Sequence, residues 1–208
     1  MGAYSPLPWL DGDFGSERAF GDEVLQTIAL PTVRQLAAEQ TPFIGLLYAG
    51  LILTPRGIRV IEFNARFGDP ETQAVLPRLV TPLSGLLFAA ATGGLGSLPR
   101  PEFRPDAAVT VVLASEGYPE APETGRTIEG LDAAASVPGV HIAHAATAIG
   151  ATDDTGSAPL VATGGRVLNV VAIGSDFAEA RRRAYEALGH LRLEGGQYRT
   201  DIAARVAE

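Results

Sequence analysis

The sequence predicts an α+β fold in two parts, because short β-branched strands and amphipathic helices occur on both sides of a proline-rich segment. That segment, LPRPEFRP at residues 98–105, has the composition of a domain boundary. We therefore expect a first part at residues 1–98, a linker at 99–106 and a second part at 107–204.

Helices and a hairpin are expected early in the first part. Residues 16–28 have helical spacing, and Pro31 is expected to break or restart the helix before residues 32–39, because proline has no backbone N–H to donate. Residues 43–54 are apolar and β-branched enough for a buried strand. A Pro-Arg-Gly turn then returns the chain as a second strand at residues 58–64.

Two more helices are expected before the linker, at residues 71–79 and 83–91, and the sequence Gly-Gly-Leu-Gly ends the second of them. Pro70 suits the first helical position, and Asp69 suits the N-cap because proline disfavours helical geometry in the residue before it. Glu71 is favourable in the first turn. Asp69 and Glu71 therefore have a structural explanation that needs no ligand.

The second part is expected to be α+β. Residues 108–114 and 140–146 read as strands, and residues 160–173 read as a hairpin that turns at Thr-Gly-Gly. Ser175 is expected to cap a helix that runs from residue 176 to 191.

Composition excludes several classes of function. The chain of 208 residues carries a net charge of −8, which opposes non-specific nucleic-acid binding. It has no cysteine, so it has neither disulfides nor a thiolate nucleophile. Its longest apolar stretch is far shorter than the roughly 20 residues that a membrane helix needs. We expect no nucleic-acid partner, no membrane contact and a cytoplasmic location.

The polar side chains at residues 62 to 66 are the strongest indication of a site. Glu62 and Asn64 lie at alternate positions of a predicted strand, and Arg66 joins their face if the strand persists. Ile61 and Phe63 then point the other way. The strand therefore offers a carboxylate, a carboxamide and a guanidinium on one side.

This set of groups is typical of phosphate chemistry assisted by a metal ion. Mg²⁺ takes oxygen ligands and is usually held by one or two protein groups together with substrate phosphates. A planar guanidinium suits the oxygens of an anion bound beside the metal. The alternative interpretation, a solvated strand edge followed by a capped helix, remains open on these residues alone.

A longer stretch around these residues resembles a known family. VIEFNARFGDPETQAVLPRL at residues 60–79 is similar to the hallmark of phosphoribosylamine–glycine ligase, an ATP-grasp enzyme of purine biosynthesis. Six other segments are similar to family segments in the same order: MGAYSP at 1–6, PTVRQLAAE at 31–39, GLLYAGL at 45–51, AAVTVVLASEGYP at 107–119, GGRVLNVVAIG at 164–174 and YRTDI at 198–202. The resemblance covers nearly the whole chain.

The resemblance implies the C-terminal half of an ATP-grasp domain followed by a small mixed α/β C-terminal domain. It implies ATP-dependent amide formation between glycine and 5-phosphoribosylamine through a glycyl phosphate. Glu62 and Asn64 would bind Mg²⁺ or Mn²⁺, and Arg66 would stabilise negative charge on the transferred group. Asp69 and Glu71 would face the amine substrate.

The chain departs from the family pattern in the second part. Residues 144–148 read His-Ala-Ala-Thr-Ala where the family has His-Ala-Gly-Thr-Lys, so any contact of this loop with nucleotide or substrate is in doubt. Gly50 stands where many ATP-grasp relatives carry a further metal carboxylate, although the ligase family shares this glycine.

Three other signals predict no site. His141 and His144 are three residues apart on a predicted strand and so face opposite sides. Asp153-Asp154 lacks EF-hand spacing. The arginines at residues 181–183 are expected to form a solvated helix face.

The resemblance also implies that much of the enzyme is absent. All sixteen basic residues are arginine, whereas ATP-grasp enzymes use lysines in their other half to hold the nucleotide phosphates. We expect an internal methionine as the start, from a split gene or a truncated record, and a missing N-terminal half as protein partner. The chain alone is expected to be inactive. The alternative is a non-catalytic folded remnant or interaction module.

Overall fold

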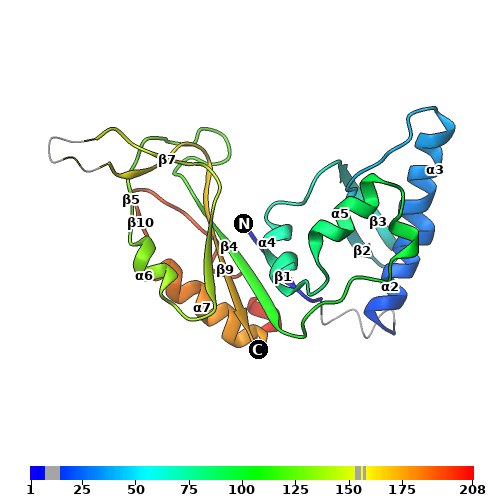
Figure 1. The fold of residues 1–208 in the computed structure, drawn as a ribbon. Helices are drawn as coiled ribbons and strands as arrows, with labels where there is room; N and C mark the ends of the chain where they lie inside the picture. The colour runs from blue at the N-terminus through cyan, green and yellow to red at the C-terminus, as the bar shows by residue number, and fades with distance from the viewer. Residues whose placement is uncertain (8–14, 153–155, 157) are drawn as a thin grey trace. The chain divides into compact units, whose positions relative to one another are not determined.

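The computed structural model describes residues 1–7, 15–152, 156 and 158–208 (Figure 1). The chain forms two compact units, each built from separate stretches of sequence. The larger unit consists of Met1–Pro6, Asp69–Arg78 and Arg104–Glu208, and the smaller unit consists of Leu7–Gly68 and Leu79–Phe103. The mixed α+β class is confirmed. The predicted domain limits on either side of the linker stay a prediction.

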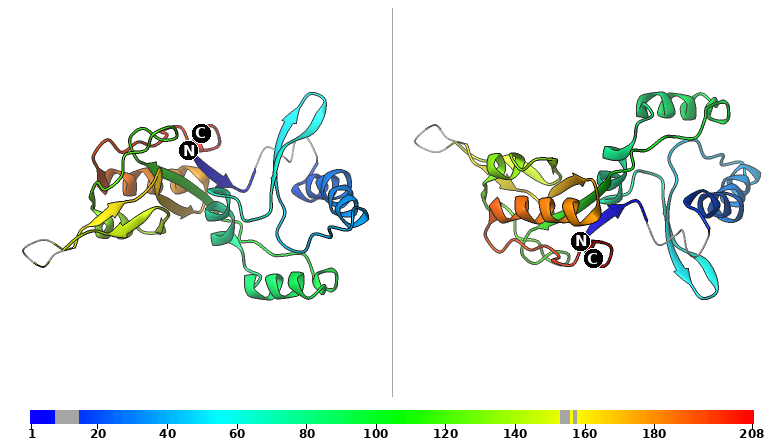
Figure 2. Two further views of the ribbon diagram at one scale, coloured as in Figure 1. Left: turned by 90° about the horizontal axis from the view of Figure 1, so that it is seen from above. Right: turned by 90° about the horizontal axis from the view of Figure 1, so that it is seen from below.

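A four-stranded antiparallel sheet forms the centre of the larger unit (Figure 2). Its strands, in spatial order, are β1 (Gly2–Ser5), β4 (Ala107–Ala114), β9 (Arg166–Gly174) and β6 (Val140–His144). Every residue of β4 is buried, as expected for a short continuous apolar run.

The first strand, β1, was not predicted. It pairs with β4 so closely that a Cβ on Gly2 would lie 2.5 Å from the carbonyl oxygen of Thr110. Glycine is therefore the residue that permits this approach.

The predicted hairpin at residues 160–173 is wrong. β8 (Leu160–Ala162) pairs with β7 (Thr147–Ile149), whereas β9 pairs with β4 on one edge and β6 on the other. Since both edges of β9 are occupied, β8 turns to a different partner. The strand expected at residues 140–146 ends at His144.

Helix α7 (Phe177–His190) packs against the sheet through a stripe of small residues. Ala180, Ala184, Ala187 and Leu188 are its buried residues, at the spacing of one helical face. The N-cap is Asp176, whose side chain accepts from the N–H of Glu179, so the prediction of Ser175 as the cap is wrong.

One short α-helix, a second pair of strands and a 3-10 turn also belong to the larger unit. Helix α6 (Leu131–Ala135) packs against α7, and β5 (Ile128–Glu129) pairs with β10 (Arg192–Leu193). A 3-10 turn, η4 (Ala204–Val206), lies near the end of the chain.

Two of the three consecutive arginines have structural contacts, so the expected solvated face is wrong for them. Arg181 donates to the carbonyl oxygens of Thr200 and Ile202. Arg183 donates to the carbonyl oxygen of Ile173 at 2.6 Å. Arg182 alone fits the prediction, with a side chain 63% exposed.

Helix α4 (Glu71–Val75) continues into a 3-10 turn, η2 (Leu76–Arg78). The helix predicted at residues 71–79 therefore consists of an α-helical part followed by a 3-10 part. The buried Arg78 ends it and donates to Ser5 Oγ and to the carbonyl oxygens of Arg104 and Asp106. These bonds hold the end of β1 to the stretch that precedes β4.

The helix at residues 17–38 of the smaller unit is not broken at Pro31, contrary to prediction. Helix α2 (Glu17–Val24) leads through a π-helical turn, η1 (Leu25–Ala29), into α3 (Leu30–Ala38). Pro31 lies in the first turn of α3, where a missing N–H is tolerated. The π-helical turn before it keeps the helix continuous.

A two-stranded hairpin and one helix follow in the smaller unit. Strand β2 (Tyr48–Thr54) pairs with β3 (Gly57–Asn64), and α5 (Leu83–Ala91) precedes a 3-10 turn, η3 (Leu95–Ser97). The strand predicted from residue 43 begins later, at Tyr48, and it is not buried, because its sheet has two strands only. In the described residues, no helix is long and apolar enough to cross a membrane.

Candidate active site

Glu62 and Asn64 lie on the same side of β3, at the end where the strand leaves its partner. The amide nitrogen of Asn64 donates to Glu62 Oε1 at 2.9 Å. The two side chains therefore meet, as the alternation of the strand requires. Across the hairpin, Glu62 lies opposite Gly50 and Asn64 lies opposite Tyr48.

Gly50 provides the space for the Glu62 side chain. A Cβ at residue 50 would lie 3.1 Å from Cγ of Glu62, closer than such contacts normally are. The pairing also shifts by one residue between Gly50 and Leu51, which leaves Ile61 as an extra residue of β3. The bulge and the glycine together position the carboxylate.

The donor chemistry of this pair fits a hard divalent cation. The hydrogen bond uses one carboxylate oxygen and the amide nitrogen, so the second Glu62 oxygen and the Asn64 amide oxygen remain as candidate ligands. Within the described ranges, no group of three or more His, Cys, Asp or Glu side chains could form a full protein cage. One or two oxygen ligands are what Mg²⁺ takes when phosphates supply the others.

Arg66 lies beyond the strand. Since β3 ends at Asn64, the condition that the strand persists is not met, and alternation does not place the Arg66 side chain. Its guanidinium donates to the carbonyl oxygen of Phe67 at 2.8 Å. Its catalytic role stays a prediction.

Asp69 and Glu71 belong to the larger unit, whereas Glu62, Asn64 and Arg66 belong to the smaller one. Pro70 occupies the N-cap of α4 and no side chain caps the helix, so the N-cap prediction for Asp69 is wrong. Glu71 does lie in the first turn. The roles of Asp69 and Glu71 toward substrate stay predictions.

The Asp69 side chain is turned to Arg166 instead. Arg166 donates to the Asp69 carboxylate at 3.0 Å and to its carbonyl oxygen at 2.7 Å, and Gln73 donates to the other carboxylate oxygen at 3.0 Å. The Arg166 Nε also donates to the Tyr118 hydroxyl at 3.1 Å. One guanidinium thus joins the start of α4 to β9 and to the loop after β4.

Sequence reasoning missed Arg166 and Tyr118. Arg166 lies 97 residues from Asp69, so no local pattern pairs them. The one local signal is Gly165, where a Cβ would lie 2.2 Å from the Tyr118 ring. Glycine at this position allows the ring to lie against the backbone.

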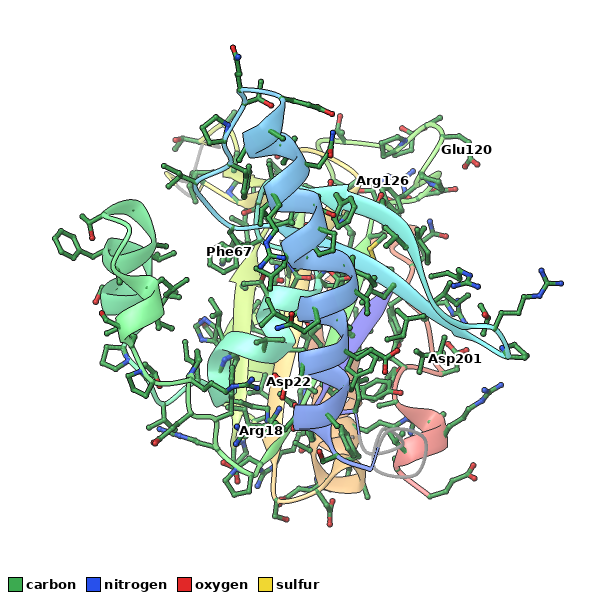
Figure 3. All side chains as sticks on the ribbon, turned by 90° about the vertical axis from the view of Figure 1, so that its right-hand side faces the viewer. Arg18, Asp22, Phe67, Glu120, Arg126 and Asp201 are labelled. Atoms are coloured by element: carbon green, nitrogen blue, oxygen red, sulfur yellow. The ribbon has the colours of Figure 1, made fainter. Side chains whose placement is uncertain are left out.

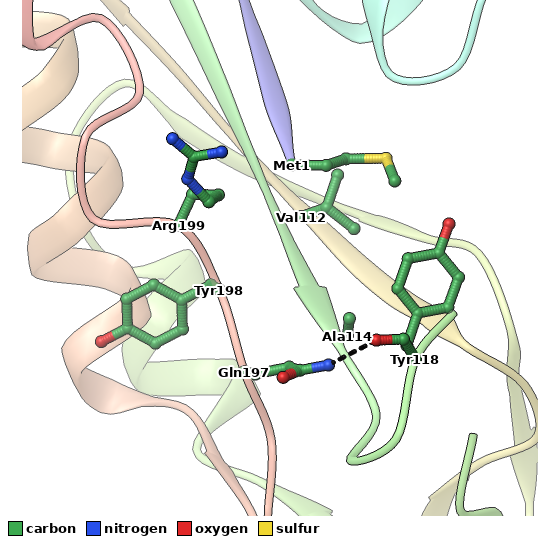
Figure 4. A pocket seen from close by; sticks show the side chains of 7 residues that line it. All are labelled: Met1, Val112, Ala114, Tyr118, Gln197, Tyr198 and Arg199. Carbon is green, nitrogen blue, oxygen red and sulfur yellow. Dashed lines mark hydrogen bonds between the residues drawn. The ribbon is translucent and has the colours of Figure 1, made fainter. Parts of the chain in front are cut away.

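A pocket of about 220 Å³ lies beside Tyr118 within the larger unit (Figure 4). Its lining consists of Met1, Val112, Ala114, Tyr118, Gln197, Tyr198 and Arg199. Gln197 donates to the carbonyl oxygen of Tyr118 at 3.0 Å and holds one wall in place.

The cationic side chain of the pocket, Arg199, is already paired. Its guanidinium donates to both carboxylate oxygens of Asp201, with Nε at 2.8 Å from one of them. The bond from Arg199 lowers the pKa of the Asp201 carboxyl, and the same bond raises the pKa of Arg199. The Arg199 guanidinium therefore adds little uncompensated positive charge to the pocket.

His141 and His144 lie on β6, and that they hold no metal stays a prediction. His141 and His144 are both exposed, and His144 Nδ1 lies 2.9 Å from Oγ1 of Thr147, the first residue of β7. Asp153 and Asp154 lie outside the described residues.

Comparisons with known proteins define the class. Residues 1–72 match the model "Phosphoribosylglycinamide synthetase, ATP-grasp (A) domain", and residues 108–205 match "Phosphoribosylglycinamide synthetase, C domain". The matched models therefore identify the chain as part of an ATP-grasp protein. The chain belongs to the phosphoribosylamine–glycine ligase family, and it corresponds to part of an ATP-grasp domain followed by the C domain.

Individual relatives agree with the family models. The phosphoribosylamine–glycine ligase of Leifsonia xyli subsp. xyli is 71% identical over 99% of this chain and 47% of its own length. A crystal structure of the ligase from Thermotoga maritima matches with a TM-score of 0.67 and 33% identity, over 97% of this chain and 46% of that one. The chain thus spans about half the length of the relatives that it matches.

A more distant structure shares the fold alone. The biotin carboxylase domain of the 2-oxoglutarate carboxylase of Hydrogenobacter thermophilus, in complex with MgADP, ADP and bicarbonate, matches with a TM-score of 0.61 at 16% identity. The match covers 95% of this chain and 40% of that one.

Proposed function

We propose that this chain supplies one half of the catalytic machinery of a phosphoribosylamine–glycine ligase, which joins glycine to 5-phosphoribosylamine in de novo purine biosynthesis. The observation that carries the proposal is the pair formed by Glu62 and Asn64 at the end of β3, in the part that matches the ATP-grasp model. Membership of the ligase family supports the choice of substrates.

The reaction has two steps. A carboxylate oxygen of glycine attacks the γ-phosphorus of ATP, so that ADP leaves and glycyl phosphate forms. The amine nitrogen of phosphoribosylamine then attacks the acyl carbon, the C–O bond to phosphate breaks, and the nitrogen loses a proton. Such transfers depend on positioning and electrostatics rather than on a protein nucleophile.

The residues of this chain have distinct proposed roles. Glu62 and Asn64 hold Mg²⁺ or Mn²⁺ through their oxygens, and the ion when bound neutralises phosphate charge. Arg66 stabilises the negative charge of the transferred phosphoryl group and of the acyl phosphate. Asp69 and Glu71 face the amine substrate, with Asp69 held in place by Arg166.

The remaining contacts to ATP come from another polypeptide segment. The chain has no lysine, and it spans about half the length of its relatives. We propose that its protein partner is the portion of the ligase that this chain does not match.

Mixing the two portions tests the proposal. The chain is combined with the part of the Leifsonia xyli ligase that it does not match, and glycine-dependent phosphate release is measured. Release should exceed that of either portion alone. Glu62→Ala should lower it by about 10²–10³, by analogy with the loss of one preorganised group, whereas Glu120→Ala on an exposed loop should not. A fully active Glu62→Ala variant rejects the metal assignment.

A non-catalytic remnant or interaction module is the second candidate. The exposed apolar side chains of the smaller unit favour it, because such surface is typical of interaction sites. No phosphate release above that of either portion alone would reject the ligase proposal and support this alternative.

A further inference from the structure

The smaller unit has almost no hydrophobic core in its described residues. The buried cluster comprises residues from Ala107 to Ala203, all in the larger unit. In the described part of the smaller unit, Ala89 is the one buried hydrophobic residue. Even a 60-residue domain buries about 60% of the surface that its unfolded chain exposes. The described part of the smaller unit therefore lacks the buried interior that a self-sufficient domain has.

Polar surface contacts account for part of what holds this unit together. Asp22 of α2 accepts from Arg100 and lies 3.9 Å from Arg18; Figure 3 shows Arg18 and Asp22 on this helix. The Arg100 and Asp22 side chains are 57% and 44% exposed. Exposed ion pairs contribute about 0–1 kcal/mol each, so they cannot replace a core.

Helix α5 exposes large apolar side chains to solvent. Its sequence, LSGLLFAAA, contains one polar side chain, that of Ser84. A helix that is apolar on all sides is normally buried. In this chain Phe88 is 72% exposed and Leu87 is 44% exposed.

An apolar groove of about 340 Å³ lies beside this helix, entirely within the smaller unit. Its lining includes Ile44, Leu46, Leu86, Leu87, Ala90 and Leu95. No charged side chain is among the lining residues, and Ile44 is 72% exposed. The groove therefore suits an apolar segment of another polypeptide.

We propose that this groove, together with the exposed side of α5, is the docking surface for the portion of the ligase that the chain does not match. The inference rests on the proposed function. Relatives are about twice as long as this chain, and residues 1–72 match an ATP-grasp model, so the smaller unit is part of a larger folded domain. A second copy of the chain is a poorer occupant, because each copy carries a net charge of −8 and like charges repel.

Substitutions at the groove test the proposal in a binding measurement. The chain is titrated calorimetrically with the part of the Leifsonia xyli ligase that it does not match. Leu87→Asp and Ile44→Asp should each weaken binding at least tenfold, since a charge in an apolar contact removes a central anchor. Ile149→Asp is the matched control, because Ile149 is 69% exposed on β7 of the larger unit, and it should change the affinity less than twofold.

A dye readout separates docking from misfolding. Both groove positions are exposed, so the variants should keep the wild-type circular dichroism. The wild-type chain should bind the apolar dye ANS and release it when the second polypeptide is added. The groove variants should retain the dye under the same conditions.

Each outcome decides between the two proposals. If the two portions form a complex that Leu87→Asp weakens, but no glycine-dependent phosphate release is seen, the docking surface is supported and the proposed ligase function is rejected. An active complex whose affinity is unchanged by Leu87→Asp overturns the docking surface alone. A homodimer that Leu87→Asp dissociates, or no complex at all, also overturns it. Joining the two portions in one polypeptide then tests the function independently.

Discussion

At the scale of single residues, one backbone position controls the candidate metal ligands. Gly50 lies directly across the hairpin from Glu62, and the Glu62 side chain passes over it. The 2.9 Å bond from Asn64 fixes the carboxylate from the other side. Space at one residue and a hydrogen bond at another therefore determine where the Glu62 oxygens lie.

Gly50→Ala should displace these oxygens without unfolding the hairpin. The added Cβ would lie 3.1 Å from Glu62 Cγ, so the side chain must shift by a few tenths of an ångström. We expect phosphate release by the combined portions to fall roughly tenfold, since a 1 Å misplacement can cost about 10². Gly21→Ala is the control, because a Cβ there would meet nothing within 4 Å. Equal losses in both variants would contradict this explanation.

Alternation along the strand predicted that Glu62 and Asn64 share a face, because period-2 geometry is local. It could not place Arg66, since the end of β3 depends on where pairing with β2 stops. It also could not find Arg166, which meets Asp69 only after the sheet has formed.

At the scale of secondary structure elements, the start of α4 is attached to β9 by a side chain rather than by a cap. Arg166 bonds both the carboxylate and the carbonyl oxygen of Asp69. The N-cap residue of α4 is Pro70, whose side chain has no hydrogen-bond acceptor, so the helix begins without an N-cap hydrogen bond. The segment that holds Asp69 and Glu71 therefore depends on β9 for its position.

Arg166→Ala should loosen α4 more than it destabilises the whole chain. The Arg166 and Asp69 side chains are 33% and 41% exposed, so we expect a global loss of roughly 1 kcal/mol or less. Amide hydrogen exchange in Glu71–Val75 should quicken several-fold. Arg182→Ala, at an exposed pair on α7, should leave that exchange unchanged. Unchanged exchange in α4 of the Arg166 variant would show that the bonds are incidental.

A carboxyl group at the N-terminus of α7 is expected to make the stability of the chain depend on pH. The backbone N–H of Ser175, and then its hydroxyl, lower the pKa of the Glu179 carboxyl. A depressed folded-state pKa stabilises the chain above the unfolded value of about 4.3, and this stabilisation is lost as pH falls through the folded value. Glu179→Gln should therefore reduce the fall in Tm between about pH 5 and pH 3.

Glu186→Gln is the matched control for that experiment, since Glu186 lies on the same helix and pairs only with Arg182 in the described contacts. The acid side of its Tm profile should follow the wild type. An unaltered profile for Glu179→Gln would rule out this contribution.

Secondary structure was predictable where one segment carries its own pattern. The glycine-rich stretch after residue 91 predicted the end of α5 (Leu83–Ala91), and the apolar run predicted β4. The partner of β8 was not predictable, because the choice between β7 and β9 depends on which sheet edges other strands occupy. The unbroken helix at Pro31 likewise depends on a π-helical turn without a sequence signal.

At the scale of the whole molecule, hydrophobic burial is unequal between the units. The larger unit contains the buried cluster, and the smaller unit exposes Ile44, Ile61 and Phe88. Hydrogen exchange should therefore be slowest in β4 and β9 and fast in α5. Adding the portion that the chain does not match should slow exchange in α5 and leave β4 unchanged. Equally slow exchange in both units of the chain alone would contradict this view.

The most direct test of the proposed metal site is the Mg²⁺ dependence of glycine-dependent phosphate release by the combined portions. Glu62→Gln keeps the shape of the side chain but removes its charge. We predict that the half-saturating Mg²⁺ concentration rises at least tenfold, since even residues outside the ligand shell can change metal affinity by about 10–100-fold. A wild-type Mg²⁺ profile in this variant would contradict the assignment of Glu62 as a metal ligand.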